Sequence, residues 1–287
     1  MDKPESRKAD ADSKAVLEME KLLGSLSPVP VCKTTACPNM SACLSRRSAA
    51  WMILGGSCLR RCAYCDIAFG EPDPIDESEP AQVAEAAKAL GLSHIVITAP
   101  ARDDLPDSGA AHIARTIAAL KGTLPSATVE VLIPDLKGDR TALKVVLDAQ
   151  PDILSHSVGT VPSLYRGMRP ASAYTRSLEL LGHVKELSPR VFTKSGLWVG
   201  LGETGDEAQW VLDDLRAVGC DFLTIGQYEP PTPEHMAAAE EITPEAFESL
   251  KSAALDMGFR DAVCGPLARM TYASPESLAM LASKRKP

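Results

Sequence analysis

From residue 50 onward, short apolar runs alternate with longer segments of helical apolar spacing. The apolar runs are Trp51–Leu54, His94–Thr98, Val129–Ile133, Ile153–His156, Leu197–Leu201 and Phe222–Ile225. The helical segments are 79–91, 109–122, 139–149, 171–187, 205–218 and 244–257. Repeated strand–helix units of this size predict an α/β fold with a parallel sheet and right-handed crossovers. About six such units favour a partial (β/α)6 barrel, with a doubly wound open sheet as the alternative.

We expect this repeat to form one of three regions. The regions are an N-terminal extension over 1–49, the barrel over 50–258 and a C-terminal extension over 259–287, with both extensions covering the barrel mouth. Residues 1–14 have the composition of a solvated tail, and Ala15–Leu23 has helical spacing. The stretch Ser27–Cys43 is too short and irregular to form a core of its own, so something other than packing must organise it.

The charge balance and the cysteine count exclude several classes of protein. The 287 residues contain 38 Asp and Glu against 30 Lys and Arg, which argues against a nucleic-acid-binding surface. No apolar run reaches the roughly 20 residues that span a bilayer. The polar N-terminus lacks the apolar centre of a secretory signal, so we expect a cytoplasmic protein with no membrane partner. Eight cysteines in that reducing compartment favour metal binding over disulfides.

Cys58, Cys62 and Cys65 form a C-x3-C-x2-C motif directly after the first predicted strand. Three thiolates on one tight loop can hold three irons of a [4Fe–4S] cluster and leave the fourth iron open to a cofactor or substrate. A zinc site usually needs four ligands, and no fourth Cys or His lies close by in the sequence. The alternative is a set of purely structural cysteines. With Tyr64 just before the last cysteine, the spacing resembles the signature of the radical SAM superfamily, whose members cleave S-adenosylmethionine (SAM).

Cys32, Cys37 and Cys43 form a second motif, C-x4-C-x5-C, in the irregular N-terminal stretch. One interpretation is a zinc knuckle or unrelated loop cysteines. The other is a second cluster, which would organise this segment because metal binding can be coupled to folding. The short distance in sequence to the first motif favours a second cluster. Cys220 and Cys264 lie in or beside apolar runs and are expected to be small buried residues.

The segment VCKTTACPNMSACLSRRSAAWMILGGSCLRRCAYC resembles the double-cysteine region of lipoyl synthases. The resemblance spans about residues 30–273 and continues through RDDLPDSGAAH, VEVLIPDLKGD, TKSGLWVGLGET, FLTIGQY and GPLARMTY. It implies an enzyme with two [4Fe–4S] clusters, in which SAM binds the cluster on Cys58, Cys62 and Cys65. Reductive cleavage of SAM then yields a radical that removes hydrogen from unactivated octanoyl carbons, and the cluster on Cys32, Cys37 and Cys43 gives up sulfur.

The resemblance also implies partners and further site residues. The partners are an octanoylated lipoyl carrier protein, a flavodoxin- or ferredoxin-type reductant and cluster-assembly proteins. Arg169 matches an arginine near SAM, and a guanidinium suits a carboxylate. Thr98 and Gln227 end predicted strands and should face the barrel mouth, with Lys194 as a weaker candidate. The glycines of Gly200-Leu201-Gly202-Glu203 either contact SAM or serve a tight turn.

Several segments depart from the family pattern at strand ends and loops. The family ends with Arg-Ser-Ser-Tyr, where a serine completes the second cluster, whereas this chain has Arg269-Met270-Thr271-Tyr272. Thr271 keeps an oxygen that can ligate iron, whereas Met270 has only a thioether; if neither binds, that iron is open to solvent, an added thiol or substrate. His156 alone survives from a polar family segment, and we favour a buried, hydrogen-bonded histidine over the alternative of a catalytic one.

These departures leave three hypotheses. The first is a lipoyl synthase that inserts sulfur into a protein-bound octanoyl group. The second is a diverged radical SAM enzyme that acts on a different substrate, which the altered loops favour because loops carry function. The third is a non-catalytic cluster protein that carries electrons or sulfur.

Overall fold

The computed structural model describes residues 19, 21–23, 28, 30–35 and 37–284. The predicted tail over residues 1–14 lies outside the described residues. Of the predicted helix Ala15–Leu23, the described residues are helical. The irregular N-terminal stretch contains two short helices, α2 (Val31–Thr34) and α3 (Met40–Ser45).

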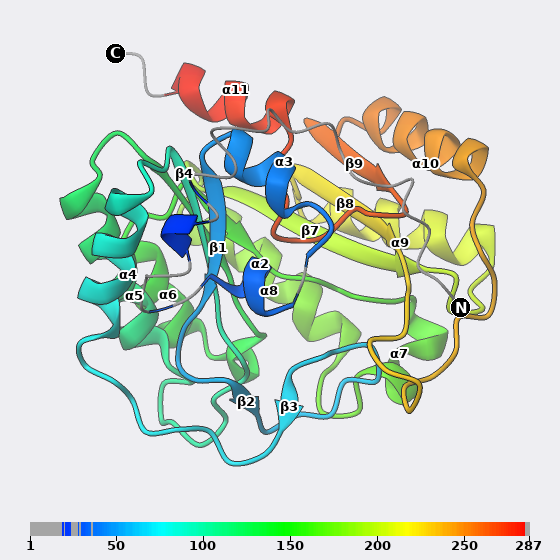
Figure 1. Cartoon of the computed structure of the whole chain (residues 1–287). Coiled ribbons are helices and arrows are strands. Elements are labelled where there is room, and N and C mark those ends of the chain that lie inside the picture. The colour runs from blue at the N-terminus through cyan, green and yellow to red at the C-terminus, as the bar shows by residue number, and fades with distance from the viewer. Residues whose placement is uncertain (1–18, 20, 24–27, 29, 36, 285–287) are drawn as a thin grey trace.

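The centre of the fold is a seven-stranded sheet in which all neighbouring strands are parallel and follow one another in chain order. The strands are β1 (Ser48–Met52), β4 (His94–Thr98), β5 (Thr128–Leu132), β6 (Ile153–Ser155), β7 (Phe192–Val199), β8 (Phe222–Gln227) and β9 (Asp261–Gly265). The order never reverses, so the sheet has no switch point and the doubly wound alternative is wrong. The predicted partial barrel is confirmed, with six strand–helix units followed by a seventh strand (Figure 1).

Helices connect successive strands and cover one face of the curved sheet (Figure 1). They are α4 (Glu79–Ala89), α5 (Ala110–Thr123), α6 (Arg140–Asp148), α7 (Pro162–Met168), α8 (Tyr174–Leu187), α9 (Gly205–Ala217) and α10 (Pro244–Asp256). Val129 and Val131 pack into the core beneath these helices. Because side chains alternate along a strand, Glu130 between them faces the interior of the half barrel, as does Lys194 on β7.

Three elements differ from the sequence prediction. The helix expected over 171–187 begins at Tyr174, after Pro170, and an unpredicted helix, α7, precedes it with Pro162 in its first turn. Strand β7 begins five residues earlier than the run Leu197–Leu201 and ends before Gly200, whose φ of +86° breaks the extended backbone. Strand β9 was not predicted, because it is short and carries small and polar residues.

The two extensions lie at different places on the barrel. Helices α2 and α3 contact β1, across the open side of the sheet (Figure 1). Helix α11 (Pro275–Lys284) instead packs through Leu281 against the first residues of three strands, Ile153, Phe192 and Phe222. We expected the whole C-terminal extension to cover the mouth, but α11 closes the opposite end. Within the described part of the chain, no helix is long and apolar enough to cross a membrane.

Candidate active site

The loop of Cys58, Cys62 and Cys65 follows β1 at the carboxyl end of the sheet. It begins in a small ribbon in which β2 (Ser57–Cys58) pairs with β3 (Ala68–Phe69). The Cys65 N–H donates to the Cys62 carbonyl at 3.1 Å, which keeps the motif tightly turned. Ala63 N–H donates to the Met168 carbonyl at 2.8 Å and so ties the loop to the end of α7. The three cysteines therefore lie at the strand ends where chemistry gathers in barrels.

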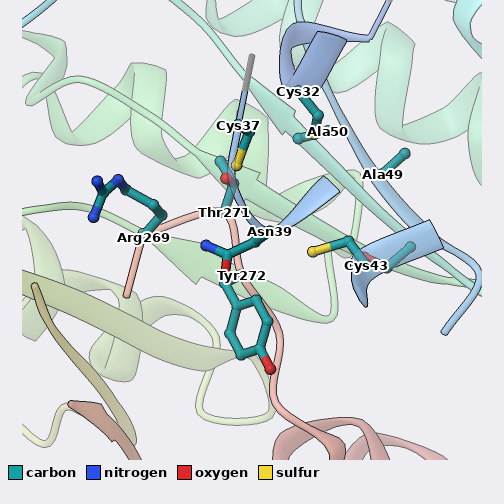
Figure 2. Close-up of a pocket in the computed structure, with 10 residues that line it drawn as sticks. Cys32, Cys37, Asn39, Cys43, Ala49, Ala50, Arg269, Thr271 and Tyr272 are labelled. Atoms are coloured by element: carbon teal, nitrogen blue, oxygen red, sulfur yellow. The ribbon is translucent and has the colours of Figure 1, made fainter. Parts of the chain in front are cut away.

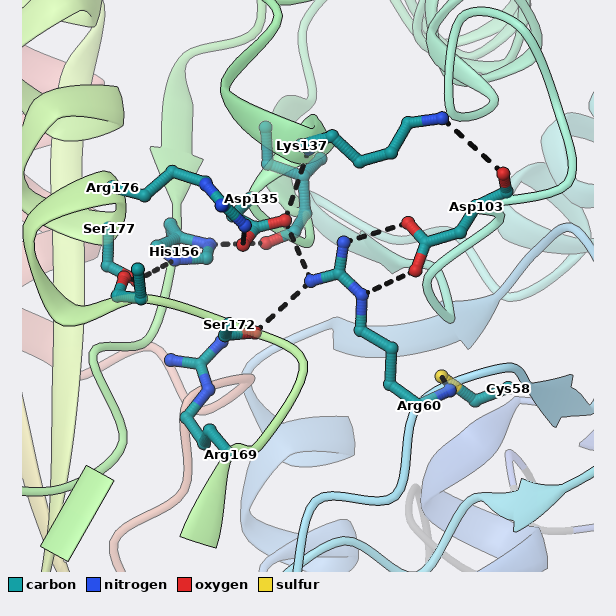
Figure 3. Close-up of polar contacts among 12 residues, drawn as sticks. Cys58, Arg60, Asp103, Asp135, Lys137, His156, Arg169, Ser172, Arg176 and Ser177 are labelled. Atoms are coloured by element: carbon teal, nitrogen blue, oxygen red, sulfur yellow. Dashed lines mark hydrogen bonds and ion pairs between the residues drawn. The ribbon is translucent and has the colours of Figure 1, made fainter. Parts of the chain in front are cut away.

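Arg60, between the first two cysteines, is clamped by aspartates from two neighbouring strand ends (Figure 3). Its Nε and Nη2 contact the two carboxylate oxygens of Asp103 at 2.7 and 2.8 Å, a bidentate pair. Its Nη1 contacts Asp135 Oδ1 at 2.7 Å and Ser172 Oγ at 3.2 Å. Arg60 and Asp135 are buried, and Arg176 also pairs with Asp135 at 3.1 Å. This network fixes the backbone of the cysteine loop to the barrel.

Arg169 and Tyr64 lie on the other side of the same loop. Arg169 Nη1 donates to the carbonyls of Ser157 and Val158 at 2.6 and 2.9 Å and to the hydroxyl of Tyr165 at 2.8 Å. Its Nε is buried and has no hydrogen-bond partner among the described residues. Burial raises the pKa of the Cys62 thiol, and the charge of Arg169 opposes that shift. The Arg169 guanidinium is therefore close to the cysteine loop, and its Nε–H remains available to donate a hydrogen bond.

Tyr64 packs its ring against the turn at Gly159. A Cβ at Gly159 would lie only 2.7 Å from the Tyr64 hydroxyl, and the φ of +82° there also favours glycine. Burial raises the pKa of Tyr64, so its hydroxyl stays protonated. His235 adds a contact from the loop after β8, with its Nε2 3.3 Å from the Cys65 carbonyl. The loop is thus enclosed by residues from several strand ends.

The second triplet surrounds a separate cavity between the two ends of the chain (Figure 2). Its lining residues are Cys32, Cys37, Asn39, Cys43, Ser48, Ala49, Ala50, Arg269, Thr271 and Tyr272. All three cysteines of the motif and Thr271 are therefore brought together. Met270 does not line this cavity but a neighbouring pocket with Gly196, Trp198 and Gly226. Among the described residues, no group of three or more Cys, His, Asp or Glu side chains is placed to hold a single metal ion.

Two further contacts join the N-terminal helices to the C-terminal segment at this cavity. Asn39, just before α3, donates from Nδ2 to the Leu267 carbonyl at 2.7 Å. Arg46, just after α3, donates to the hydroxyl of Tyr272 and also lies over its ring, 5.3 Å from the centroid. These bonds cross more than 220 residues of sequence, so the cavity exists only when both ends of the chain are in place.

The buried thiols of both triplets favour the protonated form in the absence of a bound metal. Burial raises the pKa of Cys65 to about 11 and that of Cys43 to about 12. Burial also raises the pKa of Cys32 and Cys62. Because thiolates are the ligands, metal binding at either triplet must release protons. Three thiols and a hydroxyl line one cavity, and three more thiols lie beside a guanidinium whose buried Nε has no partner among the described residues; these two arrangements fit two iron–sulfur clusters and SAM.

Comparison with known proteins agrees with this geometry. Residues 52–215 match the model of the radical SAM superfamily. A lipoyl synthase of Caldanaerobacter subterraneus subsp. tengcongensis is 47% identical over 97% of this chain and 98% of the relative. The chain belongs to the lipoyl synthase family. A second lipoyl synthase, from Caldicellulosiruptor saccharolyticus, is 45% identical over 94% of each chain.

Solved structures more distant than the lipoyl synthases share the fold. Methylornithine synthase has a TM-score of 0.58 at 13% identity, over 84% of this chain and 73% of that one. HydG, a maturase of the [FeFe]-hydrogenase, has a TM-score of 0.59 at 14% identity, over 87% of this chain and 62% of that one. At this identity the similarity supports the half-barrel architecture alone, which agrees with the parallel sheet described above.

Three other predicted site residues of this lipoyl synthase family member have different surroundings. Thr98 ends β4 as expected, and its carbonyl accepts from Ile53 N–H at 2.8 Å. Gln227 ends β8, but its amide bonds the Glu240 carbonyl at 3.0 Å and Ile242 N–H at 2.9 Å, so it fastens a loop. Lys194 is buried in an ion pair inside the barrel and contacts the segment of Thr271, not the Cys58 loop.

The departures from the family pattern also have structural explanations. His156 is buried, with Nδ1 2.8 Å from the Ile133 carbonyl and Nε2 2.9 Å from Ser177 Oγ, so the interpretation of a hydrogen-bonded core histidine is confirmed. Gly200 and Gly202 have positive φ, and Glu203 accepts from the N–H groups of Gly200 and Leu201 at 2.7 and 2.9 Å. That segment is a tight turn that its own glutamate stabilises.

Sequence reasoning missed the charged residues that support the cysteine sites. Asp103 and Asp135 lie within segments that resemble the family, but neither was identified as a partner of Arg60. The available signal was their position just after predicted strands, where side chains from neighbouring strands meet. Glu130 was missed because a lone acidic residue inside an apolar run gives no indication of its partner, which is 64 residues away.

Proposed function

We propose that this chain is a lipoyl synthase, which inserts sulfur at unactivated carbons of an octanoyl chain attached to a lipoyl carrier protein. The observation that carries the proposal is the cavity shared by Cys32, Cys37, Cys43 and Thr271. This second triplet distinguishes the lipoyl synthase pattern from the superfamily as a whole. Curated relatives named lipoyl synthase, 42–47% identical over nearly the whole chain, support the same substrate class.

Cys58, Cys62 and Cys65 would hold the first cluster, and SAM would bind its open iron. When bound, this group supplies the electron that cleaves SAM and starts radical chemistry, which a carbon that no base can deprotonate requires. Arg169 would bind the SAM carboxylate with its unpartnered Nε, since guanidinium–carboxylate pairs are strong. Tyr64 would pack beside it, and Thr98 would line the mouth at the end of β4.

Cys32, Cys37 and Cys43 would hold the second cluster, with the Thr271 hydroxyl as its fourth ligand. When bound, this cluster supplies the sulfur. Thr271 is favoured over Met270 because only Thr271 lines the cysteine cavity. The residues around the cavity would hold the acyl carbon next to sulfur and exclude water, which is the protein's part in such a reaction.

The proposed reaction requires partners beyond the octanoylated carrier protein. A flavodoxin or ferredoxin would deliver electrons to the first cluster. Cluster-assembly proteins would rebuild the second cluster after its sulfur is consumed. These partners follow from the proposed chemistry.

The test is to reconstitute the protein anaerobically and add SAM, a strong reductant and an octanoyl-lysine peptide. Mass spectrometry then follows both the peptide and deoxyadenosine. We expect the peptide to gain two sulfurs in the wild-type reaction and none with C37A, which still makes deoxyadenosine. Deoxyadenosine from the wild type with an unmodified peptide would contradict the proposed substrate and favour the diverged-enzyme hypothesis. The absence of deoxyadenosine would favour the non-catalytic carrier.

A further inference from the structure

An ion pair is buried in the interior of the half barrel, between β5 and β7. Lys194 Nζ lies 3.1 Å from Glu130 Oε1, and the two side chains are 6% and 0% exposed. Ser155 on β6 donates to the same Glu130 oxygen at 2.6 Å. His94 on β4 lies 3.5 Å from the other oxygen. Side chains from three other strands, β4, β6 and β7, therefore lie around this one carboxylate of β5.

Fold stability alone is a poor explanation for such a pair. Removing two charges from water costs free energy that their attraction often fails to recover, so apolar side chains of similar volume would serve the core as well. The next layer of the interior, at the start of the strands, is apolar, with Ile153, Phe192 and Phe222 packed together. A charged pair directly above an apolar layer points to a specific contact that one of its members makes.

That contact joins Lys194 to the C-terminal segment. Lys194 Nζ donates to the Tyr272 carbonyl at 2.9 Å, across 78 residues of sequence. Tyr272 follows Thr271, which faces the cavity of the three cysteines. The hydroxyl of Tyr272 receives the bond from Arg46 at the end of α3. The barrel therefore holds the backbone of this residue, and the N-terminal extension holds its side chain.

We propose that Lys194 is a positioning residue for the second cluster, and that it holds the Tyr272 backbone so that the Thr271 hydroxyl faces the three cysteines. Glu130 fixes the direction of the Lys194 ammonium group, and the hydrogen bond from Ser155 holds the Glu130 carboxylate in place. This assignment rests on the proposed second cluster but not on the identity of the substrate. It also replaces the expectation that Lys194 contributes to SAM binding, because its contacts lie at the other cysteine site.

The test compares E130Q with the double variant E130Q/K194M. The double variant contains no unpaired buried carboxylate, and its methionine keeps most of the volume of the lysine. Both proteins still have the Thr271 hydroxyl, so the comparison isolates the bond from Lys194 to Tyr272. T271A removes the proposed ligand and leaves that bond intact. K144M, which removes an exposed lysine from α6, is the matched control for Lys-to-Met substitution.

The measurements are bound iron and sulfide per chain, the Mössbauer spectrum, and deoxyadenosine formed from SAM with a chemical reductant. We expect E130Q/K194M to lose about half of its iron, since each of two [4Fe–4S] clusters holds four irons, and to form deoxyadenosine within about twofold of wild type. E130Q should retain more iron at the second cluster than the double variant does. T271A should give the same Mössbauer spectrum for the residual second cluster as the double variant. K144M should match wild type in all three measurements.

Full iron content with a wild-type spectrum in E130Q/K194M would overturn the proposal. Equal loss of both clusters would also overturn it, because Lys194 would then support the barrel in general. Failure of the octanoyl-lysine test in the wild type is a separate result, because it contradicts the substrate while the iron comparison still decides the role of Lys194.

Discussion

The loop of Cys58, Cys62 and Cys65 is held by the barrel itself, whereas the cavity of the second triplet is assembled from both ends of the chain. Arg60 binds the first loop to Asp103 and Asp135, which follow β4 and β5. The second cavity depends on Asn39 and Arg46 from the N-terminal side and on residues 267–272 from the C-terminal side.

Because of this difference, SAM cleavage and sulfur transfer, the two steps of the proposed reaction, depend on different parts of the molecule. The residues proposed to hold the first cluster and SAM all lie within the half barrel. The proposed site for the sulfur donor also needs the two extensions, which contact β1 and the barrel interior. Damage to the second site should therefore leave SAM cleavage intact, and damage to the first should abolish both steps.

The largest expected effect comes from removing one cysteine at each site. C62A should lower deoxyadenosine formation to background, because the first cluster loses a ligand and SAM loses its binding site. C37A should abolish sulfur transfer but leave deoxyadenosine formation within about threefold of wild type, because a substitution at a site that is not coupled to the first cluster has only a small effect on it. The measurement is chromatography of deoxyadenosine alongside mass spectrometry of the peptide. Loss of SAM cleavage in C37A would show that the two sites are not independent.

The clamp on the first loop gives the next largest effect. R60M should reduce the rate of SAM cleavage about 10- to 100-fold, as removal of outer-shell partners does at other metal sites, with iron at the first site partly retained. R61M is the matched control, because Arg61 is the next residue, is exposed and stacks on Phe69 at 3.8 Å. The measurement compares the initial rates of deoxyadenosine formation by R60M and R61M. Equal rates in the two variants would contradict the role of the clamp.

A smaller and more selective effect is expected where β7 approaches the C-terminal segment. A methyl group at Gly196 would overlap the Met270 sulfur and lie 3.0 Å from Met270 Cγ. G196A should therefore displace the segment of Thr271 at a cost of about 1–3 kcal/mol, which is typical of overpacking, and lower sulfur transfer several-fold. The double variant G196A/M270A removes the overlap and should restore transfer. No rescue would mean that Gly196 acts through something other than Met270.

The effect most remote from the two cysteine sites concerns the pH dependence of the barrel itself. Burial, together with the charge of Arg169, lowers the pKa of His156 to about 4. Because the unfolded histidine binds a proton below pH 6.5 and the folded one does not, stability should fall from pH 6.5 toward pH 4, by at most about 1.4 kcal/mol per pH unit. H156N should flatten this decline in the thermal midpoint followed by circular dichroism. An unchanged slope would contradict the assignment.

The sequence predicted the parts of the fold that depend on local pattern. The strand His94–Thr98 was predicted with both of its ends, because its apolar run is bounded by Gly-Leu-Ser and Ala-Pro. Strand β7 was predicted too short because Thr193, Lys194 and Ser195 interrupt its apolar run. Those polar residues are buried, since Lys194 has Glu130 as its partner. A pattern of single residues cannot show a partner on another strand.

The same limit applies to the site. The spacing of six cysteines predicted two clusters, and the structure places Cys32, Cys37 and Cys43 around one cavity with Thr271. The roles of Arg60 and Tyr272 could not be predicted from the sequence, because each depends on contacts between segments that are distant in the chain. Gln227 was predicted to face the mouth from its position alone, but its side chain bonds a loop that the sequence pattern did not place.

The most direct test of the account is to follow the sulfur itself. The protein is reconstituted with sulfide enriched in a heavy isotope, freed of unbound sulfide, and given SAM, a reductant and an octanoyl-lysine peptide. If the second cluster is the sulfur source, the peptide gains two heavy sulfurs, and C37A, which keeps the first cluster, transfers none. A product carrying light sulfur, or one formed equally well by C37A, would contradict the assignment of the second cysteine site as the sulfur source.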